Sequence, residues 1–123
     1  MISEAESIDS GAYEPNQIMV QLSSKYTLNR AKEVIDYVCK NKQLLPLLLE
    51  AHDKIKNYFP SETLFLEMVA DPDETYEKEL IIYISTTLEP KDAIERLDLF
   101  DESWWLEASA ASDSKLLVQV EYE

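Results

Sequence analysis

The chain has 123 residues, a formal net charge of −14 and a hydrophobic content of 46%, which suits one domain with its own core. A chain this acidic repels nucleic-acid phosphates and anionic lipids, so we expect it to bind neither nucleic acid nor membranes. The single cysteine, Cys39, excludes an intramolecular disulfide, and the single glycine, Gly11, excludes the glycine-rich loops that cradle phosphates.

Residues 1–16 are predicted to form a disordered acidic tail ahead of a single domain over residues 17–123. The tail contains four acidic residues among small polar ones, and it has neither the apolar core nor the basic start of a signal peptide. The longest apolar runs, such as Leu44–Leu49, fall far short of the ~20 residues that span a bilayer. Together with the lone cysteine, these features predict a cytoplasmic protein.

Two helices joined by a short turn are predicted for the first half of the domain, after a short extended segment. Residues 17–22 carry apolar side chains at every second position, which favours an extended arm or an edge strand. Thr27 can cap a helix that runs to about Asn41, and a second amphipathic helix is predicted from about Leu45 to Phe59. Joined so closely, the two helices are expected to pack as an αα-hairpin.

Beyond Pro60 the apolar period changes from about 3.6 to 2, which predicts a passage from helices to sheet. Residues 64–69 and 79–85 are predicted to form an antiparallel hairpin, because turn-forming residues separate them. Residues 90–111 are predicted to form a crossover helix that begins at Pro90, and residues 116–122 the last strand.

The element order α-α-β-β-α-β predicts an α+β fold in which helices cover a small mixed or antiparallel three-stranded sheet. A crossover through a helix is right-handed and joins parallel strands, so the last strand should be parallel to residues 79–85. We expect it to lie beside residues 64–69. An extra edge strand from residues 17–22 is the remaining option for this sheet.

The negative charge is concentrated in one half of the chain. Residues 62–113 contain fifteen acidic and three basic residues, whereas residues 25–58 contain seven basic and four acidic ones. A surface of this sign attracts a basic protein over a long range. The alternative is that the excess carboxylates only keep the chain soluble.

The densest candidate site lies in the predicted crossover helix. Asp98, Asp101 and Glu102 recur there at three- and four-residue spacing and form an acidic ridge. Trp104 and Trp105 point about 100° apart, so we expect Trp104 in the core and Trp105 at the surface beside the carboxylates. We predict that Asp98, Asp101, Glu102 and Trp105 bind a basic protein. A homodimer contact through Trp105 and an amphipathic helix with solvated acids are the alternatives.

A second candidate site would make the protein a small ligand-binding domain or an enzyme. His52 falls on the apolar face of the second helix, and Tyr58 and Tyr83 could join it in a cleft between the helices and the sheet. A core histidine bonded to a carbonyl or a tyrosine hydroxyl is the competing interpretation, and Cys39 is predicted to be a buried, inert thiol. No catalytic constellation is visible, so a non-enzymatic function without a cofactor is favoured.

The predicted hairpin loop is rich in carboxylates of the kind that bind hard cations. These are Asp71, Asp73, Glu74, Glu77 and Glu79. Their spacing does not match an EF-hand loop, and no glycine is present for its sharp turn. We therefore predict a solvated loop and no metal site.

Residues 88–106, LEPKDAIERLDLFDESWWL, followed by the closing strand 115–122, resemble a group of small acidic conserved hypothetical proteins of cyanobacteria and other prokaryotes. The resemblance covers about residues 44–123, and its signature is the helix that joins acidic residues to the tryptophan pair. It supports the fold and implies no active site. Some small acidic proteins of this type resemble the neutralising partners of toxin–antitoxin modules, which implies an inhibitor-like or antitoxin-like role.

Overall fold

The computed structural model describes residues 15–70, 78–111 and 116–123 and confirms the predicted α+β class. The helical elements are α2 (Pro15–Ser23), α3 (Ala31–Lys40), α4 (Leu44–Lys56), α5 (Pro90–Phe100), the π turn η1 (Asp101–Trp105) and α6 (Leu106–Ala111). The strands are β1 (Thr27–Leu28), β2 (Thr63–Ala70), β3 (Lys78–Thr86) and β4 (Leu116–Tyr122). None of the described helices is long and apolar enough to cross a membrane. The predicted tail lies outside the described residues, except that Pro15 and Asn16 begin α2.

The predicted extended arm is wrong, because residues 15–23 form the helix α2. Pro15 suits the first position of a helix, where its missing N–H costs nothing. Ile18 and Leu22 are fully buried on one stripe, while Met19 and Val20 between them are exposed. A spacing of four residues fits a period of two as well as a period of 3.6, so alternation alone could not separate the two structures.

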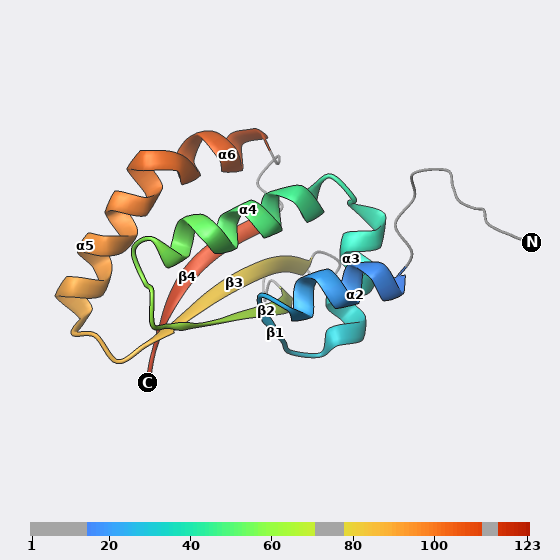
Figure 1. Ribbon diagram of the computed structural model, residues 1–123, viewed down its shortest axis with the longest axis horizontal. Coiled ribbons are helices and arrows are strands. Elements are labelled where there is room, and N and C mark those ends of the chain that lie inside the picture. The colour runs from blue at the N-terminus through green and yellow to red at the C-terminus, as the bar shows by residue number, and fades with distance from the viewer. Residues whose placement is uncertain (1–14, 71–77, 112–115) are drawn as a thin grey trace, which may run out of the picture.

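Helices α3 and α4 lie where the two helices were predicted, but they do not pack against each other as a simple hairpin. Helix α2 lies against both of them, and Figure 1 shows α3 running across the line of α4. The predicted cap at Thr27 is also wrong, because Thr27 pairs with Phe65 in a short parallel bridge between β1 and β2. Arg30, with φ 49° and ψ 61°, then turns the chain in the left-handed region into α3.

The described strands form one sheet in the order β1-β2-β3-β4. Strands β2 and β3 are the predicted antiparallel hairpin, and β4 runs parallel to β3 as the right-handed crossover requires. The expected place of β4 beside β2 is wrong: β4 pairs with β3, and the two-residue strand β1 takes the free edge of β2. The sheet is therefore mixed and four-stranded rather than three-stranded.

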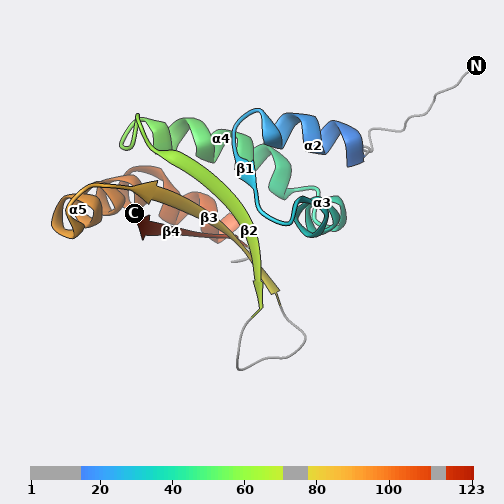
Figure 2. The same cartoon turned by 90° about the horizontal axis from the view of Figure 1, so that it is seen from below.

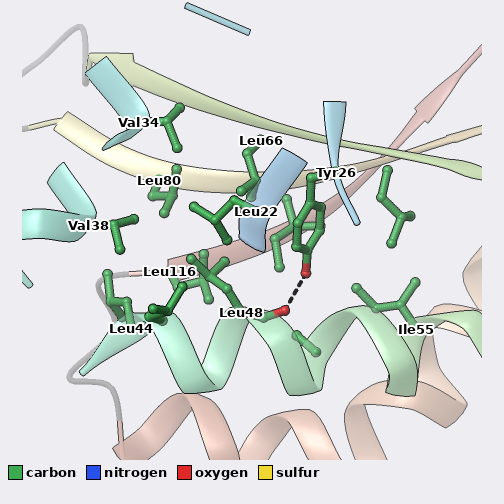
Figure 3. Close-up of a cluster of buried hydrophobic side chains, with 14 of the residues drawn as sticks. Leu22, Tyr26, Val34, Val38, Leu44, Leu48, Ile55, Leu66, Leu80 and Leu116 are labelled. Atoms are coloured by element: carbon green, nitrogen blue, oxygen red, sulfur yellow. Dashed lines mark hydrogen bonds between the residues drawn. The ribbon is translucent and has the colours of Figure 1, made fainter. Parts of the chain in front are cut away.

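The core lies between the helices and one face of the sheet. In Figure 2, α2 and α4 run above the strands and α5 lies to their left, and helix and strand side chains meet in a single cluster. The strand residues that point into the core are Leu64, Leu66, Met68, Leu80, Ile82, Ile84 and Leu116. Figure 3 shows the one polar contact within this cluster, in which the Tyr26 hydroxyl donates to the Leu48 carbonyl at 2.7 Å. A buried hydroxyl needs such a partner, and burial raises the pKa of the Tyr26 phenol strongly.

Candidate functional site

The predicted crossover helix is continuous from Pro90 to Ala111, but its middle is a π turn. Pro90 begins α5 and the Ala93 N–H donates to the Glu89 carbonyl at 3.0 Å, so the helix starts as predicted. At η1 the Leu106 N–H donates to the Asp101 carbonyl, five residues earlier. This wider turn holds one extra residue and rotates everything that follows relative to a regular helix.

The π turn brings Trp105 into the core, while Trp104 packs against the core beside it. Trp105 is 7% exposed and stacks on Phe100, with ring centroids 5.8 Å apart and planes at 19°. Trp104 is half-buried and tilted against the same two rings. The expectation that Trp105 lies at the surface is therefore wrong. A homodimer contact through Trp105 and neighbouring apolar residues stays a prediction, to which the buried indole itself can add little area.

The predicted acidic ridge is present, and its carboxylates lack basic partners. Asp98 and Glu102 are exposed, and Asp101 between them is half-buried. Burial, together with the charges of Asp98 and Glu102, raises the pKa of Asp101. Among the residues that the structure describes, none of the three forms an ion pair. The neighbouring base, Arg96, instead donates from Nη1 to the Tyr58 carbonyl at 3.1 Å.

Large apolar side chains beside this ridge are exposed to solvent. Ile94, Leu99 and Leu106 are 52%, 54% and 63% exposed. We name Ile94, Asp98, Leu99, Glu102 and Leu106 the outer helix face. The three apolar members were missed as surface residues by the sequence reasoning. Their signal was available, because all three fall outside the apolar stripe that predicts the buried side of this helix.

The three members of the predicted cleft lie at separate places. His52 Nδ1 is 3.0 Å from Asp53 Oδ1, and the His52 ring meets the buried Tyr26 ring edge-on at 5.7 Å. The Tyr58 hydroxyl donates to Ser103 Oγ at 3.0 Å. Tyr83 pairs with Phe65 on the face of the sheet that points away from the core. The predicted cleft between helices and sheet is therefore not formed by these residues.

His52 does line a polar recess of about 360 Å³ between α2, α4 and the start of β2. Lys25 and Lys56 line it too, but each basic group is already bonded within the protein. Lys25 Nζ lies 3.3 Å from Asp53 Oδ1, and Lys56 Nζ donates to the Glu62 carbonyl. The hydrogen bonds from His52 and Lys25 lower the pKa of Asp53. Lys25 and Lys56 are therefore already engaged within the protein rather than free to bind a ligand in the recess.

The remaining candidate groups are Cys39 and the acidic loop. Cys39 is a free thiol, half-buried against the core. Most of the predicted acidic loop, residues 71–77, lies outside the described residues. In the described part of the chain, no group of three or more His, Cys, Asp or Glu side chains is arranged to hold a metal ion.

Comparison with protein-family models, with curated proteins and with solved structures finds no match for this chain. The fold and surfaces define a small α+β domain with a mixed sheet, a closed core and a carboxylate-rich crossover helix. The resemblance to small acidic prokaryotic proteins stays a prediction. Function is therefore inferred from the surfaces alone.

Proposed function

We propose that this protein is a non-enzymatic interaction module whose outer helix face binds a basic protein partner, as an inhibitor or an antitoxin-like protein would. The observation that carries the proposal is the exposure of Leu99 and Leu106 beside the unpaired carboxylates of Asp98 and Glu102. Apolar side chains supply the area buried on binding, and carboxylates around them supply attraction and specificity.

The two carboxylates of this face, Asp98 and Glu102, do not stabilise the fold. Asp98 and Glu102 are four residues apart, a spacing at which like charges destabilise a helix by about 0.2–0.5 kcal/mol. A lysine at either position would turn this repulsion into attraction at no cost to the core. Lysine or arginine side chains of a bound partner would offset the repulsion between the two carboxylates, and this relief would favour binding.

The buried position of Trp105 changes the chemistry of the proposed contact. The anchors on this face are aliphatic, Leu99 and Leu106, rather than an exposed indole. Trp105 would contribute indirectly. Its ring stacks on Phe100 within the π turn, and the π turn sets the direction of the Leu106 side chain. The partner should therefore present apolar side chains flanked by lysine or arginine.

The test is affinity capture from the cytosol of the source cells, with retained proteins identified by mass spectrometry. Wild type is compared with an Asp98→Lys/Glu102→Lys variant and with a control, Asp36→Lys/Glu50→Lys. Both pairs are exposed and change the net charge equally. A basic partner that wild type and control retain, and that the helix variant loses, supports the proposal. A partner that both variants lose equally responds only to net charge, and one that the helix variant still retains contacts another surface; either result overturns it.

A further inference from the structure

The face of the sheet that points away from the core is apolar at its centre. Phe65 of β2 pairs with Tyr83 of β3, and Ile81 of β3 pairs with Leu117 of β4. These four side chains share one face, because residues at every second position of a strand point the same way. We name this surface, with Glu67 and Glu121 at its sides, the outer sheet face.

No described helix covers the outer sheet face. The helices contribute their buried side chains to the core cluster on the opposite face of the sheet, and no residue of the outer sheet face belongs to that cluster. Ile81 is 5% exposed, and Phe65, Tyr83 and Leu117 are half-buried. A sheet face left to water is normally polar at these positions, so a centre of aromatic and aliphatic side chains is a feature to explain.

At the described strand positions of this face the charged side chains are all carboxylates, although Arg30 reaches it from the turn before α3 and pairs with Glu67. The outward positions of β2, β3 and β4 hold Glu67, Glu79 and Glu121, and no lysine or arginine occupies these positions in the described strands. Glu67 is held in place by Arg30 Nη2 at 3.3 Å and by Asn29 Nδ2 at 3.2 Å. The strand register places Glu67 and Glu121 diagonal to Tyr83 on this face. Burial raises the pKa of the Tyr83 phenol, and the charges of these two carboxylates raise it further.

We infer that the outer sheet face is a second docking surface, which binds a polypeptide segment carrying arginine or lysine around an apolar centre. Arginine suits it best, because a guanidinium can stack on Tyr83 or Phe65 while it bonds to a carboxylate. A second copy of this chain is a poor occupant. Two such faces would bring their glutamates together, and each chain already carries a net charge of −14.

This inference is independent of the outer helix face, since it rests on different elements, and it is tested with a defined probe. The probe is a synthetic amphipathic helix with leucine on one side and arginine on the other. It is titrated into the full-length protein at physiological ionic strength, and backbone amide shifts are followed by NMR. We expect saturable shifts centred on residues 63–69, 79–85 and 117–121.

The deciding variant is Phe65→Thr/Tyr83→Thr, which keeps residues that favour strands and removes both aromatic rings. It should weaken probe binding on the order of tenfold, the loss typical of removing aromatic anchors. The matched control, Met19→Ser/Val20→Ser, removes exposed apolar side chains of α2 that belong to neither proposed face and should bind as wild type does. Glu121→Lys, at an exposed position, is the second variant should the double threonine variant fail to fold. It too should weaken binding.

Four results overturn the inference. One is the absence of saturable binding by wild type, and another is a set of shifts confined to residues 90–111. The third is a wild-type dimer in light scattering that the Phe65→Thr/Tyr83→Thr variant abolishes, because a second copy would then be the occupant. The fourth is loss of the probe by a Leu99→Ser/Leu106→Ser variant together with full retention by Phe65→Thr/Tyr83→Thr, because the outer helix face would then be the binding surface.

Discussion

Two regions of the molecule, the helices α3 and α4 and the crossover from α5 to α6, bury residues in the same core. They differ in whether their acidic side chains form ion pairs within the protein. Every ion pair among the described residues involves α3, α4 or the segments beside them: Lys25–Asp53, Arg30–Glu33, Arg30–Glu67, His52–Asp53 and Lys78–Glu33. The crossover, with six acidic and two basic residues over 90–111, contributes to none of these pairs. Glu33, Asp53 and Glu67 are paired with bases inside the molecule, whereas no acid of the crossover forms an ion pair with a described residue.

The largest expected effect concerns the inner side of the crossover. Trp105→Ala should lower the free energy of unfolding by about 3–5 kcal/mol, because it removes a buried ring that stacks on Phe100. Urea denaturation followed by circular dichroism measures the change. Leu106→Ala, at the next residue but 63% exposed, is the control and should stay within about 0.5 kcal/mol of wild type. Equal losses for the two variants would contradict the register that the π turn imposes.

The π turn also shows where sequence reasoning reaches its limit. The class of fold, the β2–β3 hairpin and the parallel direction of β4 follow from apolar periods and from the handedness of crossovers. The positions of Trp104 and Trp105 do not, because a regular helix of 3.6 residues per turn would place residue 104 over Phe100. No residue pattern in this sequence predicts a π turn, because the turn depends on how the aromatic rings pack in the folded protein.

The order of the strands was equally beyond local patterns. β1 is two residues long, too short for any alternation to reveal it, yet it occupies the edge of β2 that was expected for β4. At the site, spacing correctly indicated that Asp98 and Glu102 are exposed. It could not place Tyr83 on the outer sheet face, because the direction of a side chain in a strand depends on which face the helices cover.

An intermediate effect tests the polar contact inside the first region. Tyr26→Phe should lower the free energy of unfolding by about 1 kcal/mol, because the ring stays in place and only the hydrogen bond to the Leu48 carbonyl is lost. Differential scanning calorimetry measures the change. Tyr122→Phe, at a side chain that is 46% exposed, should leave stability unchanged. A Tyr26→Phe variant as stable as wild type would mean that the hydroxyl bond adds nothing to the core.

The smallest effects test the charge contrast itself, because neutralising one acid in each region should change stability in opposite directions. The pKa of Asp53 is lowered by hydrogen bonds from His52 and Lys25, so its ionised form favours the folded state. That contribution is present above the unfolded pKa of about 3.9 and is lost as the pH falls through the lower folded value. Asp53→Asn should therefore destabilise the protein slightly at neutral pH, as measured by thermal unfolding.

The pKa of Asp101 is raised, first by burial and then by Asp98 and Glu102, so ionisation disfavours the folded state. Asp101→Asn should therefore stabilise the protein at neutral pH, by no more than about 0.5 kcal/mol because water still reaches and screens this half-buried carboxyl. The advantage should shrink as the pH falls through the folded pKa and disappear below about 3.9, where both states of the wild type are protonated. Glu95→Gln, on the exposed side of α5, controls for the loss of one charge. If Asp101→Asn and Asp53→Asn shift the unfolding temperature in the same direction, the two regions do not differ in how they balance their acids. The charge contrast would then no longer support a partner-binding surface on the crossover.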